Sequence, residues 1–387
     1  MTRLRMGLVG GGDGAFIGAV HRMAAELDGR IELVCGAFSS DPSRSKRYGQ
    51  ELYDLPPNRS YGTFTEMVIE ESKLPAQQRM HFVVIATPNH LHYPVAEATL
   101  QAGFHVMSDK PVTFDLHEAK ILRALAAEKN LLFGLTHNYT GYPMVKEARQ
   151  LIKTGALGSI RRVIVEYIQG WLSERLETQG NKQARWRTDP KFSGSAGCMG
   201  DIGTHGENLL EYVTGLEIHS LCADLTTFVP GRLLEDDGNV LLRFSNGARG
   251  VLLASQIGVG EENGLKLRVY GERASLEWVQ TEPNSLIVRW PDRPLEVRRT
   301  GGPGVSEAAT AATRLPAGHP EGFLEAFALL YRNFARALEA RLEGRDPRSE
   351  DLDFPTIDDG VRGMAFIDAV VNSSTRGSVW TDFPAWN

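Results

Sequence analysis

The 387-residue chain is 42% hydrophobic and 23% charged, which is typical of a globular protein of two or three domains and excludes disordered and collagen-like chains. Asp and Glu number 48 against 42 Lys and Arg, a net charge of −6, so we expect no nucleic-acid partner and no membrane partner. No apolar run approaches the ~18 residues of a membrane helix. Cys35, Cys198 and Cys222 lie too far apart for a disulfide framework or a zinc site. These features predict a cytoplasmic protein with reduced thiols and no metal.

Strand-like and helix-like segments alternate over residues 1–137. Short apolar runs occur at Leu4–Val9, Ile31–Phe38, Phe82–Ala86, His105–Met107 and Leu131–Leu135. Between them, Asp41-Pro42 starts one helix, Tyr93–Ala102 forms another, and Asp115 with Glu118 begins a third that runs to Lys129. Apolar strands separated by helices form parallel sheets that are covered on both faces. We therefore predict a doubly wound α/β domain over residues 1–137.

The pattern changes from residue 138 onward, because strands follow one another without helices between them. The expected strands are Arg162–Gln169, Ile218–Phe228, Asn239–Phe244, Ala248–Gln256, Lys266–Tyr270, Ser275–Val279 and Ser285–Trp290. Helices are expected at Pro143–Thr154 and Gly322–Leu342, the second with Phe323, Phe327, Leu330 and Phe334 on one apolar face. Thr300–Thr313 is expected to be a surface loop. Residues 138–387 thus predict an α+β domain with a large, mostly antiparallel open sheet.

A glycine-rich turn follows the first strand. Gly10 and Gly12, with Gly18 as a displaced third glycine, fit the dinucleotide fingerprint, in which backbone approaches a pyrophosphate at the start of a helix. The position that usually carries an acid for the ribose is Ser39, with Arg44 one turn later. This pair could accommodate a 2′-phosphate, or Arg44 could be only a solvated residue. The cofactor is therefore predicted to be NAD or NADP.

Two further sites combine residues with acid–base chemistry. Lys110, in Asp109-Lys110-Pro111, follows a parallel strand and would project into the ligand crevice, unless it is only a surface lysine before a turn. Asp201 and His205 are four residues apart at a helix start and so share one face. They are either an acid–base pair or a helix cap with a core histidine.

These motifs, taken together, resemble the Gfo/Idh/MocA oxidoreductases, named after glucose–fructose oxidoreductase and inositol dehydrogenase. The resemblance covers nearly the whole chain and rests on the glycine-rich start with His21, on Ala86-Thr87-Pro88-Asn89 with His92, on Ala102-Gly103-Phe104-His105-Val106 before Asp109-Lys110-Pro111, and on Asp201-x-x-x-His205. The chain departs from the family in three places: a longer glycine loop, no acidic ribose residue, and Asp109 where the family has Glu. The resemblance implies a Rossmann domain, a second α/β domain with an open sheet, and NAD(P)-dependent oxidation or reduction of a sugar or polyol.

The resemblance also implies roles for individual residues. Lys110, Asp201 and His205 become the catalytic trio, which suits the chemistry: histidine titrates near neutral pH and can take the hydroxyl proton, lysine can stabilise the developing alkoxide, and aspartate can hold an adjacent hydroxyl. Thr87, Pro88, Asn89 and His92 would wrap the cofactor, together with Lys110. Asn138 and Tyr139 would lie between nicotinamide and substrate.

A substrate pocket is predicted around the segment that precedes the helix carrying Asp201 and His205. Tyr167, Gln169, Trp171, Arg185, Trp186 and Arg187 supply aromatic faces and hydroxyl-binding groups, although a packed loop with solvated arginines would have the same composition. His319 would either join this pocket or belong only to the turn before the late helix.

Three functions remain open at this point. The leading one is an NAD(P)-dependent dehydrogenase or reductase of a sugar, inositol or glycoside. The second is a cofactor-retaining hydrolase or isomerase that uses transient oxidation, and the third is a non-catalytic sugar or dinucleotide sensor. We also expect a homodimer or homotetramer, since an open sheet carrying Val165, Tyr167, Leu241, Leu253 and Val269 would bury a face between subunits.

Overall fold

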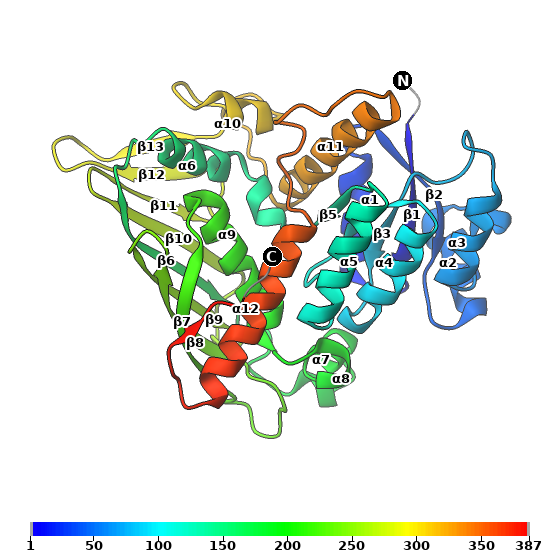
Figure 1. Ribbon diagram of the computed structural model, residues 1–387, viewed down its shortest axis with the longest axis horizontal. Coiled ribbons are helices and arrows are strands. Elements are labelled where there is room, and N and C mark those ends of the chain that lie inside the picture. Colours follow the sequence, from blue (N-terminus) through cyan, green and yellow to red (C-terminus); the bar gives the residue numbers. More distant parts are fainter. Residues whose placement is uncertain (1–2, 385–387) are drawn as a thin grey trace. The chain divides into compact units, whose positions relative to one another are not determined.

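The computed structural model describes residues 3–384, and by packing the chain divides into two compact units (Figure 1). The first unit contains the chain up to Thr136 together with Phe327–Val361. The second contains His137–Ala326 and the chain from Arg362 onward. Helices α11 (Phe323–Leu342) and α12 (Ile357–Thr375) therefore each contribute residues to both units. The sequence predicted two domains, residues 1–137 and 138–387, and so placed residues 327–361 in the second domain. In the structure these residues pack with the first unit.

A parallel sheet forms the centre of the first unit. Its strands are β1 (Leu4–Gly10), β2 (Ile31–Ala37), β3 (Phe82–Ala86), β4 (His105–Ser108) and β5 (Phe133–Leu135). All neighbouring strands are parallel, in the order β2-β1-β3-β4-β5. This confirms the doubly wound domain. The strand order reverses between β1 and β3, and ligands bind such sheets outside the carboxyl ends of the strands at that point.

The helices of this unit begin where the sequence signals predict. Its helical segments up to Thr136 are α1 (Phe16–Glu26), α2 (Pro42–Tyr53), η1 (Pro57–Arg59), α3 (Phe64–Lys73), η2 (Asn89–Leu91), α4 (His92–Gln101) and α5 (Leu116–Glu128). Asp41 caps α2 by accepting the N–H of Arg44, and Asp115 caps α5 by accepting that of Glu118. Sequence patterning missed α3, although Thr63 caps it in the same way.

A nine-stranded mixed sheet dominates the second unit. The strands are β6 (Ile160–Ile168), β7 (Ile218–Thr226), β8 (Asp237–Phe244), β9 (Arg249–Ser255), β10 (Gly264–Gly271), β11 (Ser275–Val279), β12 (Ser285–Arg289), β13 (Glu296–Arg299) and β14 (Thr381–Asp382). Their order is β13-β12-β11-β10-β6-β9-β8-β7-β14, and only the β6–β9 pair is parallel. The predicted open, mostly antiparallel sheet is confirmed.

Helices cover one face of this sheet. Between His137 and Ala326, the helical segments of the second unit are η3 (Asn138–Gly141), α6 (Pro143–Lys153), η4 (Leu176–Thr178), α7 (Lys182–Arg187), α8 (Pro190–Ser193), η5 (Met199–Gly203), α9 (Thr204–Thr214) and α10 (Glu307–Ala312). Helices α6 and α9 pack on the strands (Figure 1). No helix within residues 3–384 has the length and apolar character that crossing a membrane requires.

The expectation of a loop over Thr300–Thr313 was wrong, because this stretch contains α10. Ser306 caps the helix by accepting the N–H of Ala309, and Ala309 and Ala312 are buried where α10 packs on α6. The small alanines that suggested a loop are good helix formers that let two helices approach.

The assignment of side chains to the open face of the sheet also needs correction. Val165, Tyr167 and Val269 point toward the helices and are almost fully buried within the unit. Leu241, in contrast, is 50% exposed. Because side chains alternate along a strand, only one set of positions faces each side, and hydrophobic character alone did not identify which set.

One buried carboxylate ties together several segments of the first unit. Glu71 of α3 is fully buried. Its oxygens accept hydrogen bonds from Arg59 Nη2 at 2.8 Å, the Tyr61 hydroxyl at 2.9 Å and the Met80 backbone N–H at 2.9 Å. A buried carboxylate requires such partners, and removing one member of a buried ion pair leaves the other charge uncompensated.

We therefore expect Glu71→Ala to lower the free energy of unfolding by about 3–5 kcal/mol. The adjacent Glu70 offers a matched control, because its ion pair with Lys73 is exposed, and Glu70→Ala should cost at most about 1 kcal/mol. Urea denaturation of both variants measures the difference. Equal stabilities would contradict a structural role for the Glu71 cluster.

Candidate functional site

The glycine turn after β1 adopts a conformation that side chains oppose. Gly10 and Gly11 have φ of +98° and +74°, a region that L-residues avoid. A Cβ on Gly10 would lie 2.2 Å from the carbonyl oxygen of Ala86 on the neighbouring strand. The Tyr53 hydroxyl donates to the Gly11 carbonyl at 2.6 Å, and a Cβ on Gly18 would lie 2.3 Å from Gly11 Cα. The turn is thus held tightly against α1 and α2.

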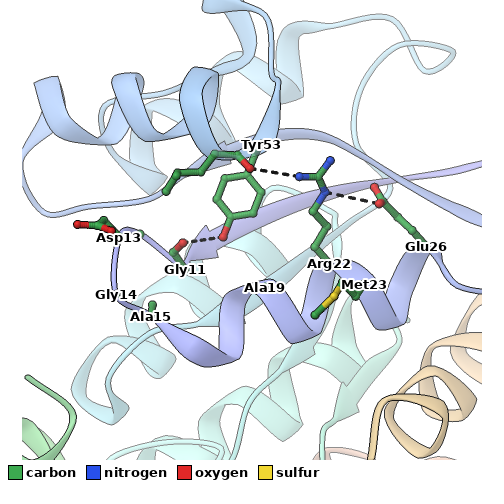
Figure 2. A pocket seen from close by; sticks show the side chains of 11 residues that line it. Gly11, Asp13, Gly14, Ala15, Ala19, Arg22, Met23, Glu26 and Tyr53 are labelled. Carbon is green, nitrogen blue, oxygen red and sulfur yellow. Dashed lines mark hydrogen bonds and ion pairs between the residues drawn. The ribbon is translucent and has the colours of Figure 1, made fainter.

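A cavity of about 480 Å³ opens beside this turn. It is lined by Gly11–Ala15, by one face of α1 and by Leu52 and Tyr53, as Figure 2 shows. Among the described residues, no side chain caps the first turn of α1. A Cβ on Gly12 would lie 2.3 Å from the Phe38 carbonyl oxygen. Exposed backbone and a free helix N-terminus are the features that bind a pyrophosphate, so the turn fits a nicotinamide dinucleotide.

Residues at the end of β2 are occupied by local contacts. Ser39 Oγ accepts the N–H of Asp41 at 3.2 Å. Arg44 Nε lies 3.6 Å from a carboxylate oxygen of Asp41, and both side chains are exposed. The backbone hydrogen bond from Arg44 lowers the pKa of Asp41. No carboxylate therefore stands at position 39, and Arg44 remains at the surface.

The segment after β3 is fastened to the turn after β4. The ring of the buried His92 contacts the Pro111 carbonyl oxygen through Nδ1 at 2.6 Å and the Thr87 carbonyl oxygen through Nε2 at 2.8 Å. Burial lowers the pKa of His92. Pro88 precedes η2, and Asn89 is buried. The hydroxyl oxygen of Thr87 is buried with no hydrogen-bond partner among residues 3–384, which fits a polar ligand at this strand end.

A charged cluster supports the predicted catalytic lysine at the end of β4. Asp109 Oδ1 accepts the N–H of Lys110 at 2.8 Å and the hydroxyl of Thr136 at 3.0 Å. His21 Nε2 lies 4.0 Å from the other carboxylate oxygen, and His21 Nδ1 contacts the Tyr331 hydroxyl at 2.6 Å. Burial raises the pKa of Asp109, but His21 and Lys110 lower it more strongly. Asp109 is therefore a carboxylate whose negative charge lies beside Lys110.

In the second unit, His205 lies in the first turn of α9 among aromatic rings. It is 8% exposed. Its ring centroid is 4.8 Å from that of Tyr139 in η3 and 6.2 Å from that of Tyr167 on β6. Its Nδ1 is 3.4 Å from Nδ1 of His137. Sequence reasoning had not singled out His137, since no local motif contains it.

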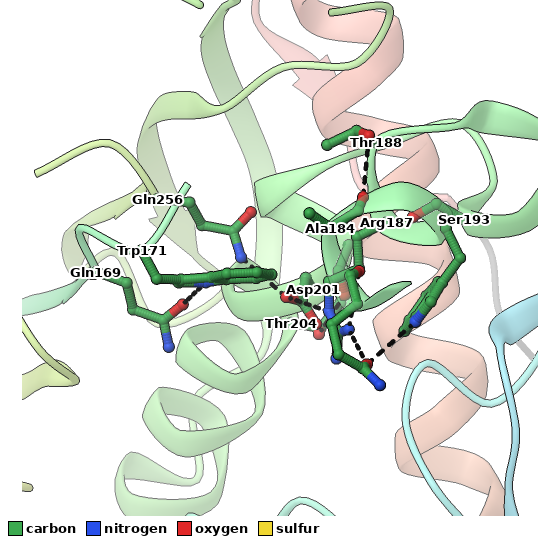
Figure 3. A network of polar contacts seen from close by, with 12 residues as sticks. Gln169, Trp171, Ala184, Arg187, Thr188, Ser193, Asp201, Thr204 and Gln256 are labelled. Carbon is green, nitrogen blue, oxygen red and sulfur yellow. Dashed lines mark hydrogen bonds and ion pairs between the residues drawn. The ribbon is translucent and has the colours of Figure 1, made fainter. Parts of the chain in front are cut away.

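Asp201, in the π-helical turn η5, lies in a polar network. One carboxylate oxygen accepts hydrogen bonds from Arg187 Nε at 3.1 Å and Gln256 Nε2 at 2.8 Å. The Arg187 guanidinium stacks 4.1 Å above the ring of Trp186 and lies 5.8 Å from that of Trp171. Figure 3 shows the indole of Trp171 beside this group. Two donors therefore bind the same oxygen of this carboxylate.

A hydrogen-bonded chain runs from the two tyrosines beside His205 to the indole of Trp171. The hydroxyls of Tyr139 and Tyr167 are 2.6 Å apart, and the amide of Asn263 bonds to both. Gln169 donates to Asn263 and accepts from the Trp171 indole. Burial raises the pKa of both phenols, so they are neutral. The structure thus brings together Tyr139, Tyr167, Gln169 and Trp171 and adds Asn263 to them.

Glu235 holds the segment that carries Asp201. Its carboxylate accepts the N–H groups of Gly197 at 2.8 Å and Met199 at 3.0 Å, and its own carbonyl accepts that of Cys198 at 3.1 Å. Burial raises the pKa of Glu235 to about 7, although these N–H groups oppose the shift. A Cβ on Gly197 would lie 2.2 Å from the Glu235 carbonyl oxygen. Glycine is therefore required at this contact.

Of the remaining predicted residues, Asn138 and Trp186 lie beside the clusters described above, and His319 does not. Asn138 is buried beside Tyr139 in η3, and its amide nitrogen has no hydrogen-bond partner among the described residues. Trp186 lies in the Asp201 network through Arg187. His319, in contrast, is exposed, and its ring contacts the Pro316 carbonyl oxygen of its own turn at 3.1 Å. The structure does not join His319 to either cluster.

Comparison with known proteins agrees with this arrangement. Residues 4–137 match the model of the oxidoreductase family with an NAD-binding Rossmann fold, and residues 145–277 match the GFO/IDH/MocA C-terminal domain. An uncharacterized oxidoreductase of Bacillus subtilis, YfiI, is 34% identical over 383 residues, which are 98% of this chain and 97% of that protein. Levoglucosan dehydrogenase of Pseudarthrobacter phenanthrenivorans is 28% identical over 301 residues, 71% of this chain and 73% of that protein.

Solved structures lead to the same family. An inositol dehydrogenase homolog of Azotobacter vinelandii, solved with NAD⁺, is 36% identical with a TM-score of 0.94, and the match covers 99% of this chain and 98% of that one. The same homolog was also solved with NADH and myo-inositol. The first unit is thus an NAD(P)-binding Rossmann domain, and the chain belongs to the Gfo/Idh/MocA family of oxidoreductases.

Proposed function

We propose that this oxidoreductase transfers a hydride between NAD(P) and a secondary alcohol or ketone of a sugar, an inositol or a glycoside. The observation that supports this most directly is the contrast between two groups four residues apart. His205 is surrounded by aromatic rings and a second imidazole, whereas Asp201 is held by a guanidinium and an amide. An imidazole in the first environment can exchange a proton, and a carboxylate in the second can bind a hydroxyl.

Family membership supports assigning Lys110, Asp201 and His205 to one reaction. The bound nicotinamide supplies the acceptor or donor of the hydride. In the oxidation direction, His205 accepts the proton of the reacting hydroxyl. The ammonium group of Lys110 donates a hydrogen bond to the same oxygen and stabilises its developing negative charge. Asp201 accepts a hydrogen bond from a neighbouring hydroxyl and orients the ring.

The proposed pocket presents aromatic faces and hydrogen-bonding groups together. Trp171 and Trp186 offer faces for the C–H surface of a ring, and Asn138, Tyr139 and Tyr167 offer groups for its hydroxyls. Structures of relatives contain myo-inositol or levoglucosan, both of which are neutral ring polyols. We do not include His319 in the pocket, because it is exposed and contacts its own turn.

A panel of inositols, hexoses and anhydro sugars, tested with NAD and NADP, would identify the substrate class by the appearance of reduced nicotinamide. Production of NAD(P)H from a ring polyol supports the proposal. Conversion of a sugar without net change in NAD(P)H would instead indicate a cofactor-retaining hydrolase or isomerase. Binding without any conversion would indicate a sensor.

Two substitutions test the catalytic roles. Lys110→Ala should lower kcat by ~10²–10³, the usual loss for an electrostatic donor to a developing oxyanion. His205→Ala should lower kcat by roughly 10²–10⁴, because the proton acceptor is lost. Steady-state kinetics on the substrate found in the panel measures both effects.

The exposed residues Lys129 and His219 provide matched controls in the same units, and their alanine variants should retain wild-type kcat. Melting temperatures of all four variants separate catalysis from folding. Near-normal turnover by a destabilised His205→Ala protein would show that His205 is only a core residue.

Cofactor preference follows from the residue at position 39. Since Ser39 carries no charge to repel a 2′-phosphate, we expect NADP to be accepted alongside NAD. Ser39→Asp should weaken NADP relative to NAD by at least ~10-fold, or about 1.4 kcal/mol. Ser72→Asp places the same charge at an exposed position of the same unit and should have no effect on either cofactor.

Fluorescence titration gives the dissociation constants of NAD and NADP. A wild type that binds NAD more than ~100-fold tighter than NADP, with no change in Ser39→Asp, would contradict this explanation.

We also propose that the open face of the nine-stranded sheet forms a homodimer or homotetramer. This face combines the exposed Leu241 with ion pairs between neighbouring strands, such as Glu166–Arg268 at 2.5 Å. Light scattering at micromolar concentration should report a multiple of the 42.7 kDa chain mass, and Leu241→Glu should reduce it because a charge would be buried at the interface. A monomeric wild type would refute the proposal.

A further inference from the structure

Two buried histidine rings of the second unit face each other. His137 is 2% exposed and His205 is 8% exposed. Their Nδ1 atoms are 3.4 Å apart, and the ring centroids are 5.3 Å apart with an interplanar angle of 88°. Position 137 belongs to none of the motifs that indicate the family. The contact therefore requires its own chemical explanation.

The backbone of His137 is fixed in place. Thr140 donates both its N–H, at 3.2 Å, and its hydroxyl, at 2.9 Å, to the His137 carbonyl oxygen. His137 follows β5 by two residues and directly precedes η3, the short helix that also carries Tyr139. These two hydrogen bonds hold the backbone of the turn that carries the imidazole.

The geometry restricts where protons can reside. Two nitrogens that form a hydrogen bond share one hydrogen, so one Nδ1 is the donor and the other is the acceptor. If His205 is the donor, its Nε2 carries a lone pair and can accept a proton. If His205 is the acceptor, a neutral ring carries its hydrogen on Nε2 and cannot act as a base there. The polarity of the Nδ1–Nδ1 contact is therefore linked to which nitrogen of a neutral His205 ring carries the lone pair.

We propose that His137 is a positioning residue for His205: its Nδ1 accepts the Nδ1–H of His205 and so fixes the tautomer with an open Nε2. This inference rests on the proposed role of His205 as the proton acceptor. When Nε2 takes the hydroxyl proton, His205 becomes an imidazolium with a hydrogen on each nitrogen. Its Nδ1–H then donates a charge-assisted bond to His137, which stabilises the charged ring. The carboxylate of a Ser-His-Asp triad orients its histidine by the same logic.

Other polar groups lie near the pair and have hydrogen bonds of their own. Tyr139 and Tyr167 contact the His205 ring through their ring faces and edges, and their hydroxyls bond to each other and to Asn263. Asp201, four residues before His205 in the sequence, uses a carboxylate oxygen for Arg187 and Gln256.

A pair of variants isolates the hydrogen bond from the volume of the side chain. His137→Asn places an amide oxygen where Nδ1 stands, so it can still accept from His205. His137→Leu has a similar branched shape and no acceptor. The holoprotein is used in both cases, and melting temperatures check that both variants are folded.

The tautomer of His205 is measured directly by NMR of protein labelled with ¹⁵N-histidine, with His205→Ala used to assign the signals. We expect wild type and His137→Asn to carry the hydrogen of His205 on Nδ1, and His137→Leu to shift it toward Nε2. This measurement needs no substrate. A wild type with the hydrogen on Nε2, or a tautomer that His137→Leu leaves unchanged, overturns the proposal.

Kinetics supply the second readout. His137→Leu should lower kcat by roughly 10–100-fold, the loss that follows when a metal-ligating histidine loses its outer hydrogen-bond partner, while KM changes by less than about 3-fold. His137→Asn should restore most of the rate. If His205→Ala retains its turnover, the proposed base is wrong whatever the tautomer. If His205→Ala is inactive but His137→Asn fails to rescue, the positioning role alone is refuted.

Discussion

The alignment of parallel strands is the constraint on which the first unit depends. Gly10 on β1 pairs with Ala86 on β3, and Ser108 on β4 pairs with Ile85 on β3 and Leu135 on β5. The chain therefore leaves all four strands at one edge of the sheet. The glycine turn, Thr87 and Lys110 follow these ends directly, so residues far apart in sequence share one edge. The hydrogen-bond ladder of the sheet, rather than any contact among the functional side chains, keeps them there.

The cost of burying polar groups organises the second unit. Each buried donor or acceptor needs a partner, and a charged group needs one most. Glu235 meets this need by binding the backbone of the η5 segment, and Asp201 by binding Arg187 and Gln256. These contacts hold a π-helical turn whose geometry is less favourable than that of an α-helix. Support of this kind fixes the orientation of the Asp201 carboxylate.

Fold and chemistry contribute differently to the functional conclusion. The Rossmann sheet and glycine turn account for the cofactor, and they are shared by oxidoreductases with many substrates. The reaction is instead inferred from the different surroundings of two side chains, His205 and Asp201. In the proposed function, the histidine among rings is the proton acceptor and the carboxylate among donors binds a hydroxyl, although the two residues are only four apart. The proposal of a ring-polyol substrate draws on the aromatic residues beside them.

Local sequence determined a large part of this protein. The strand Phe82–Ala86 and the helix starts at Asp41 and Asp115 follow from apolar runs and capping residues, which act over a few neighbouring positions. The glycine turn, Lys110, Asp201 and His205 were likewise found from motifs. Where local signals conflicted with tertiary packing, packing prevailed. Thr300–Thr313 contains a helix whose buried alanines pack on α6.

Only the tertiary structure decided the partners of the functional groups. His137 and His205 are 68 residues apart, and Asp201 and Gln256 are 55 apart. Which sheet face each strand residue occupies, the exposure of His319 and the return of residues 327–361 to the first unit were also not evident from the sequence. Such contacts depend on how the chain closes long loops and on which buried polar groups then lack a partner. Neither the closure of long loops nor the need of a buried polar group for a partner can be read from a short stretch of sequence, because both arise only when distant segments pack together.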